Sequence, residues 1–263
     1  MAVGLTRGTV RLAQAAGGAV RDLLFPPRCL LCLDGPASHG ESFCSACADN
    51  IADERSRLAC PTCGSDVAKY EVRLERCATC RGRSMKIAGT ARVGPYRLAL
   101  AHIFRAYKFH DREELGLTLG EWLVDSVRGA AWLDCVEAVV SVPTHWRHRL
   151  DRRFHAADVL AAHLAKRLQR PHVPILRRVR AGRHQLGLSH AQRVANVRGA
   201  FALESGVELH NARLLLVDDV RTTGATIEEC AKVLRRAGAA EVYAAVLLSA
   251  SHTSAGGRVL GPI

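Results

Sequence analysis

The sequence has no apolar run long enough to cross a bilayer, since its richest window, residues 242–250, has only the length of a strand. The first 24 residues also lack the continuous apolar segment and small-residue cleavage site of a secretory signal peptide. We therefore expect no membrane span and a cytoplasmic location. The scattered apolar and Arg residues of 1–24 predict an amphipathic leading helix, which packs on the protein rather than in a membrane.

The chain of 263 residues is 48% hydrophobic and 24% charged, which excludes a disordered or fibrous protein. Its net charge of +12 is concentrated between residues 145 and 198, where 13 Lys and Arg face two acids. Anionic partners such as phosphates or nucleic acid fit this excess. Only five of the 37 basic residues are Lys, so an Arg-rich composition set by the genome is the alternative explanation.

Eight of the ten cysteines form four Cys-x-x-Cys pairs, separated by 11, 12 and 13 residues. Two such pairs supply the four thiolates of one tetrahedral zinc site, so four pairs predict two sites. Sequential pairing costs the least loop closure, and a cross-brace of first with third and second with fourth is the alternative. The predicted ligands are Cys29, Cys32, Cys44, Cys47, Cys60, Cys63, Cys77 and Cys80.

A disulfide framework is the competing interpretation of these cysteines, but no secretion signal accompanies them and a chain of this size needs no staples. Residues 25–85 contain few large apolar side chains, so metal binding should supply much of their folding free energy. Both zinc ions are then structural, because four cysteines leave no open coordination position. The remaining Cys135 and Cys230 are expected to be buried packing residues.

A strand, loop and helix unit follows Arg213. Apolar residues 214–217 predict the strand, and residues 228–236 have helical spacing. Between them stand Asp218, Asp219 and a Thr/Gly turn, which brings backbone N–H groups and a helix N-terminus to one place and suits a phosphate. The two acids must serve something else nearby, such as sugar hydroxyls or a Mg²⁺-bound polyphosphate. The unit lacks the Lys of a Walker loop and the Gly-x-Gly-x-x-Gly of a dinucleotide turn.

Residues 86–263 alternate strand and helix patterns, which predicts an α/β fold with a parallel sheet flanked by helices. Strands are expected at 87–93, 137–143, 173–179, 200–203, 214–217 and 242–248, and helices at 98–109, 115–127, 156–169 and 228–236. Ligands bind beyond the carboxyl ends of strands in such sheets. Residues 141–144 and the Asp218–Asp219 pair both follow strands, so we expect them to meet.

The segment from Val217 to Thr226 resembles the phosphoribosyl-pyrophosphate (PRPP) motif of type I phosphoribosyltransferases. The resemblance implies that Asp218 and Asp219 hold the ribose hydroxyls, with Mg²⁺ accompanying the PRPP. It also assigns a 5′-phosphate loop, consisting of Thr222, Thr223, Gly224, Ala225 and Thr226, and a pyrophosphate loop, consisting of Pro143, Thr144 and His145. Arg221 departs from the motif, in which an apolar residue or Tyr is usual.

Further segments resemble the ComF (competence protein F) family, among them Val142 to Phe154, Tyr107 to Phe109 and Gly199 to Phe201. Together with the Cys-rich beginning, they imply a double zinc ribbon followed by a type I phosphoribosyltransferase-like domain. The resemblance covers essentially residues 22 to 250. PRPP carries about five negative charges, and the departing pyrophosphate needs cations to stabilise it. The basic candidates for pyrophosphate or DNA are Arg147, Arg149, Arg152, Arg183 and Arg193.

Two hypotheses follow. In the first, which family membership implies, the protein handles incoming single-stranded DNA in natural transformation, together with proteins of the uptake machinery. In the second, it is an active phosphoribosyltransferase of nucleotide or amine metabolism with no role on DNA. The sequence identifies no acceptor and no catalytic residue. Aromatic residues make up only 5% of the chain, so DNA binding should depend more on charge than on stacking.

Overall fold

The computed structural model describes residues 28–35, 37, 42–68, 77–78, 80–109, 112, 114–143, 155–180 and 190–250. The chain divides into two compact units, Met1–Asp53 and Glu54–Ile263. The expected leading helix of residues 1–24 lies outside the described residues. The expected domain limits at 24/25 and 85/86 stay a prediction.

The first unit consists of a cysteine-bearing turn and the beginning of helix α2 (Ser45–Arg55). Alanines at positions 46, 48 and 52 favour the helix. Phe43 and Ile51 are buried, and the described residues of this unit contribute few other large apolar side chains to a core.

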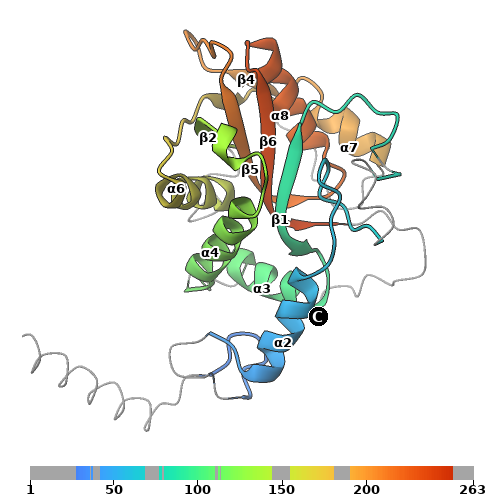
Figure 1. Cartoon of the computed structure of the whole chain (residues 1–263), viewed down its shortest axis with the longest axis vertical. Coiled ribbons are helices and arrows are strands. Elements are labelled where there is room, and N and C mark those ends of the chain that lie inside the picture. Colours follow the sequence, from blue (N-terminus) through green and yellow to red (C-terminus); the bar gives the residue numbers. More distant parts are fainter. Residues whose placement is uncertain are drawn as a thin grey trace, which may run out of the picture. The chain divides into compact units, whose positions relative to one another are not determined.

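The second unit is built on a sheet of four parallel strands in the order β1-β6-β5-β2 (Figure 1). The strands are β1 (Gly89–Pro95), β2 (Ala138–Ser141), β5 (Arg213–Arg221) and β6 (Glu241–Ser249). In the register, Val217 of β5 lies between Ser141 of β2 and Ala245 of β6. Because the strands are parallel, their carboxyl ends meet at one edge of the sheet, and this edge carries the candidate site.

Helices cover both faces of this sheet, as the sequence predicts (Figure 1). On one side, α4 (Glu114–Arg128) and α6 (Ala156–Leu168) pack against the strands, with α3 (Leu98–Phe109) beside α4. On the other side, α8 (Ala225–Arg236) packs against β5 and β6. The central strand β5 is buried from Leu214 to Val217, and alternation sends Leu214 and Leu216 toward α8. The expected α/β architecture is therefore confirmed.

One part of the expected sheet is wrong. The segments expected as strands at 173–179 and 200–203 form a separate antiparallel ribbon of β3 (Leu176–Arg178) and β4 (Phe201–Leu203). Among the described residues, the parallel sheet ends at β2, beside which His172 makes an isolated bridge to Val139. The ribbon instead packs with α8 and leads into α7 (His190–Val197), which also contacts α8. Alternation within a strand does not specify its neighbour, so the sequence could not distinguish these arrangements.

The residues that precede the sheet are tied to it by polar contacts. Thr90 Oγ1 donates a hydrogen bond to the carbonyl of Thr62 at 2.8 Å, and the buried Arg92 forms an ion pair with Asp66. Glu54, which is only 4% exposed, accepts hydrogen bonds at 3.0 Å from two backbone N–H groups in the first turn of α3. This carboxylate satisfies donors that a helix N-terminus leaves without partners.

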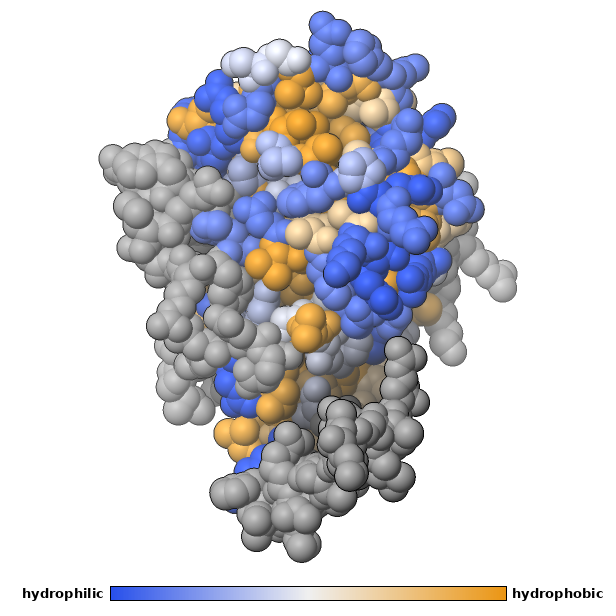
Figure 2. Space-filling model, turned by 90° about the vertical axis from the view of Figure 1, so that its left-hand side faces the viewer, coloured by the Kyte–Doolittle hydropathy of each residue, from blue (hydrophilic) through white to orange (hydrophobic). Residues whose placement is uncertain are grey.

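Figure 2 shows one face of the molecule, on which hydrophobic residues are exposed between hydrophilic ones. Leu117 on α4 and Val159 on α6 are among the exposed apolar side chains. Among the described residues, no helix has the length and apolar character to cross a membrane.

Candidate functional site

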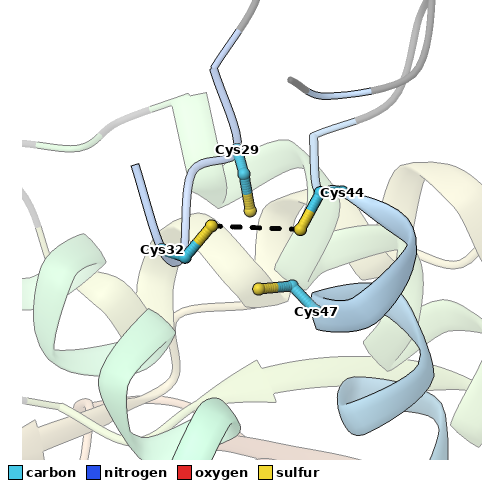
Figure 3. A group of neighbouring side chains, drawn as sticks. All are labelled: Cys29, Cys32, Cys44 and Cys47. Atoms are coloured by element: carbon cyan, nitrogen blue, oxygen red, sulfur yellow. Dashed lines mark hydrogen bonds between the residues drawn. The ribbon is translucent and has the colours of Figure 1, made fainter. Parts of the chain in front are cut away.

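The first four cysteines gather in the first unit. Their side chains point toward one another, two from a turn and two from the beginning of α2 (Figure 3). The Sγ atoms of Cys32 and Cys44 are 3.9 Å apart. Backbone N–H groups of Leu31 and Gly35 point at the sulfurs of Cys29 and Cys32, at 3.4 and 3.5 Å. Such N–H groups stabilise thiolates, which are the form that binds metal.

The second four cysteines gather in the second unit and are all buried. The Sγ atoms of Cys63 and Cys77 are 3.5 Å apart, and those of Cys60 and Cys77 lie 3.7 Å from that of Cys80. Gly64 directly follows the Cys60/Cys63 pair with φ +68°, and a β-carbon there would lie 2.8 Å from Thr90 Cγ2. This position therefore needs glycine both for its backbone angle and for the close approach to β1.

Both groups fit zinc. Four thiolates at the usual zinc–sulfur distance of about 2.3 Å stand about 3.8 Å apart at the corners of a tetrahedron, close to the sulfur separations here. The groups join the first pair with the second and the third with the fourth, so sequential pairing is confirmed and the cross-brace is excluded. The Cys63 side chain and backbone N–H groups lower the pKa of Cys60 to about 4 against the opposing effect of burial, whereas Cys60 and burial raise the pKa of Cys63.

The two cysteines outside these groups differ from each other. Cys230 on α8 is fully buried, as expected, and burial followed by the charge of Asp218 raises the pKa of its thiol well above the ordinary value. The expectation that Cys135 is buried is wrong. It ends the short 3₁₀ helix Leu133–Cys135 and is exposed.

Asp218 and Asp219 lie near the carboxyl-terminal end of β5, and their side chains contact different partners. Asp219 forms an ion pair with Lys108 from α3. The carboxylate of Asp218 accepts the backbone N–H of Asp219 at 2.8 Å and lies within electrostatic reach of Lys108 and of Arg178 on β3. Two acids and two bases from separate elements are thus concentrated at one sheet edge.

The environment of Asp218 disfavours its charged form. Burial, followed by the negative charge of Asp219, raises the pKa of Asp218 to about 8, although the Asp219 N–H, Lys108 and Arg178 act in the opposite direction. A carboxyl that is kept partly protonated near neutral pH is typical of a site that gains a cation or hydrogen-bond donors from its ligand.

The turn after β5 leads directly into α8. Gly224 adopts φ +78° at the N-cap, and Thr223 Oγ1 accepts the N–H of Ala225 at 3.3 Å. The helix begins three residues earlier than the sequence predicts, because the Gly224 turn itself starts it. The first N–H groups of α8 therefore face the end of β5, and a cavity of about 380 Å³ borders Thr223 and Ala225.

The end of β2 lies beside this loop. The N–H of Val142 donates to the carbonyl of Val217 at 2.9 Å, so residues 141–143 do meet the end of β5 as expected. Ser141 is buried, and its hydroxyl contacts Asp158 of α6 and, at 3.4 Å, Nε2 of His172.

The described residues include only some of the predicted basic and pyrophosphate-loop positions. Pro143 follows β2, and Arg193 lies half-buried on α7. The other candidates lie outside the described residues: Thr144, His145, Arg147, Arg149, Arg152 and Arg183.

The chain matches two family models, the double zinc ribbon domain over residues 20–81 and the phosphoribosyl transferase domain over residues 156–256. It is 31% identical over 220 residues to competence protein F of Haemophilus influenzae, which covers 82% of this chain and 93% of that protein. The chain belongs to the competence protein F family. Another relative, DNA utilization protein YhgH of Salmonella typhimurium, is 33% identical and covers 84% of this chain and 96% of that protein. The structure of orotate phosphoribosyltransferase from Aeropyrum pernix has a TM-score of 0.34 at 26% identity, over 53% of this chain and 62% of that one.

The sequence does not identify two side chains that the structure places at the site of this competence protein F family member. Lys108 belongs to a segment that resembles the family, and it pairs with Asp219, which lies 111 positions later in the sequence. Arg178 is expected in a strand of the main sheet, but it reaches Asp218 from the separate ribbon. The single signal available was that Lys108 is one of only five lysines in an Arg-rich chain.

Proposed function

We propose that this protein binds PRPP with Mg²⁺ at the carboxyl end of β5 and uses the site in handling single-stranded DNA during DNA uptake. The observation that carries the first part is the arrangement of Asp218 and Asp219 directly before the Gly224 turn and the N-terminus of α8. Membership of the competence protein F family, with relatives named for competence and DNA utilization, supports the second part.

The chemistry of the loop suits a phosphate. The Gly224 turn lets the backbone approach a ligand closely, and the free N–H groups at the beginning of α8 donate to its oxygens. Hydroxyls of Thr222, Thr223 and Thr226 add donors from the same short segment. The positive end of the helix dipole favours the dianion over the monoanion.

The carboxylates suit the sugar and the cation. Asp218 and Asp219 accept hydrogen bonds from vicinal ribose hydroxyls, and carboxylate oxygens are the ligands that Mg²⁺ prefers. Bound Mg²⁺ supplies charge neutralisation for a departing pyrophosphate. Lys108, which contacts Asp219, holds that carboxylate in place and supplies a second positive charge at the same edge. Pro143 and the following Thr144 and His145 are proposed as the pyrophosphate loop.

Calorimetric titration of PRPP into zinc-loaded protein, with and without Mg²⁺, tests the phosphoribosyl site. We expect Mg²⁺-dependent binding, and its loss when Asp218→Asn and Asp219→Asn are combined. If the folded, zinc-loaded protein binds no PRPP, the loop is an inherited scaffold. Release of pyrophosphate with candidate acceptors then separates an active transferase from a binding module, and transferase activity without any DNA binding would favour the metabolic alternative.

For the DNA role, the 13 basic residues and two acids between residues 145 and 198 support sequence-tolerant binding to the phosphate backbone. We expect affinity for oligothymidylate to fall steeply from low to moderate salt, and the salt slope to shrink by about two charges in Arg147→Ala with Arg149→Ala. A flat salt profile would exclude this electrostatic mode. We further propose that the protein acts in the cytoplasm with proteins of the uptake machinery, since zinc-binding thiolates suit a reducing compartment.

A further inference from the structure

Arg221 is a buried cation without an ion pair. It ends β5 within the PRPP-like motif, at a position where the resemblance leads one to expect an apolar residue or Tyr. Its side chain is only 4% exposed, and the structure gives it no ion-pair partner among the described residues. A buried guanidinium is costly unless charge or hydrogen bonds compensate it, so its surroundings should explain why it is there.

One side of Arg221 faces the second cysteine cluster. Its Nη1 donates to Ser65 Oγ at 3.2 Å, and that hydroxyl lies 3.4 Å from Cys63 Sγ. Since Arg can only donate, Ser65 accepts from it and keeps its own proton to donate to a Cys63 thiolate. A zinc ion with four thiolates carries a net charge of about −2. The cluster, once metallated, therefore adds negative charge beside the guanidinium, in addition to the Glu228 carboxyl within its electrostatic reach.

The other side of Arg221 faces the phosphate loop. A β-carbon on Gly224 would lie 3.0 Å from both Nε and Nη2, so the guanidinium lies directly against the turn that starts α8. Its Nε is buried without a hydrogen-bond partner. Ser249 of β6, which pairs with Arg221 in the sheet, also reaches the cysteine segment and donates to the carbonyl of Gly64 at 2.6 Å. The Gly224 turn is therefore connected to the cysteine cluster through Arg221 and Ser65.

We propose that the second zinc site holds the phosphate loop in its binding geometry through Ser65 and Arg221. Arg221 is then a positioning residue, and zinc binding at Cys60, Cys63, Cys77 and Cys80 is thermodynamically coupled to phosphate-ligand binding at the loop. Coupling between two sites is reciprocal, so a phosphate ligand must strengthen zinc binding by the factor by which zinc strengthens ligand binding. The coupling between zinc and PRPP binding rests on the proposed PRPP function. The contact from the cysteine cluster through Ser65 and Arg221 to the loop does not.

Hydrogen exchange of the peptide spanning residues 222–227 tests the link without any ligand. In zinc-loaded protein, Ser65→Ala and Arg221→Met should raise exchange of this peptide by about tenfold, the effect of losing one hydrogen bond to a charged group. Ser126→Ala on α4 is the matched control, since it removes a hydroxyl that donates to Trp122. Metal analysis must return unchanged zinc in each variant. If the exchange of peptide 222–227 is unchanged in both Ser65→Ala and Arg221→Met, the proposal is overturned. If Arg221→Met folds poorly, Ser65→Ala alone decides the result.

Zinc release to a chromogenic chelator tests the coupling itself. Cys32→Ser removes a ligand of the first site, so release from this variant reports the second site. We expect saturating Mg²⁺-PRPP to slow release several-fold in Cys32→Ser and to have no effect once Ser65→Ala is added; a merely structural role for Ser65 would leave the ligand effect intact. Equal release with and without PRPP, in protein that calorimetry shows to bind PRPP, would refute the coupling. Absence of PRPP binding would refute the proposed function instead, and the exchange result would still decide the link.

Discussion

The raised pKa of Asp218 makes a quantitative prediction about pH. If protein with an ionised Asp218 binds PRPP much more tightly than protein with a neutral side chain there, the apparent affinity scales with the ionised fraction. With a pKa of about 8, that fraction is about 1% at pH 6 and one half at pH 8. Affinity should therefore rise about 50-fold between pH 6 and pH 8. Affinity rises with pH because burial and the charge of Asp219 favour the protonated form of Asp218. Ligand binding to the ionised form therefore releases a proton.

The assay is calorimetric titration of Mg²⁺-PRPP at pH 6, 7, 8 and 9, repeated in buffers of different ionisation enthalpy to count released protons. The ligand's own phosphate ionisation, near pH 6, acts equally on Asp218→Asn, which should keep that part of the pH profile and lose the rest. Asp219→Asn removes a negative neighbour, so its midpoint should move to lower pH. These variants bind more weakly, but the comparison needs only the shape of each profile.

A measurement without ligand gives an independent answer. The ¹³C chemical shift of the Asp218 carboxyl, assigned from Asp218→Asn, should titrate well above the ordinary Asp range. A midpoint near 4 would refute the reasoning about burial. A high midpoint combined with parallel affinity profiles in wild type and Asp218→Asn would refute the claim that the ionised form binds the ligand.

Other predictions concern the supports of the site. Lys108→Met leaves Asp219 without its ion-pair partner and should lower the free energy of unfolding by about 1–3 kcal/mol at pH 8 in urea titrations; an unchanged midpoint would show that water replaces the ammonium. Glu54→Gln removes the charge that accepts two N–H groups of α3 and should cost about 1 kcal/mol, whereas Asp49→Asn on the exposed side of α2 should cost nothing. Gly224→Ala imposes a β-carbon on a left-handed backbone and should cost about 1–2 kcal/mol while weakening phosphate binding. Metal analysis should return two zinc ions per chain, and a value near one would mean that one cysteine group is empty.

Most of the fold follows from local patterns in the sequence. The expected helix at 98–109 matches α3, and the strand expected at 242–248 lies within β6. Buried parallel strands form continuous apolar runs, and such runs leave little ambiguity. The sequence predicts the wrong partners for β3 and β4 because each strand is only three residues long, too short for an alternating pattern to develop. For segments this short, the partner is chosen by tertiary packing, which no local pattern records.

The site was predictable to the extent that it is local. The cysteine pairs and the Asp218–Asp219 motif each lie within a short segment, so spacing alone identified them. Lys108 and Arg178 come from distant elements and meet the two acids only because α3 and the ribbon end at the same sheet edge. Charge alone could not select them from 37 basic residues. The pairing of the cysteines had the same limitation, because both arrangements satisfy the spacing.

The departure at Arg221 shows how an exception to a motif can carry structural information. An apolar residue or Tyr would fill the space beneath the Gly224 turn at lower desolvation cost, so the guanidinium needs a compensating negative charge that other sequences do not require. The carboxyl of Glu228 lies within electrostatic reach of Arg221, and four metal-bound thiolates in the cysteine cluster add further negative charge. A second buried cation, Arg92, donates to Ser249, forms an ion pair with Asp66 and lies within electrostatic reach of Cys63 in the same cluster. In the proposed arrangement, the two buried arginines lie next to a zinc centre with a net charge of about −2. Metal binding and the position of the phosphate loop then depend on each other electrostatically. Loss of zinc should therefore disturb the phosphate loop before it unfolds the sheet.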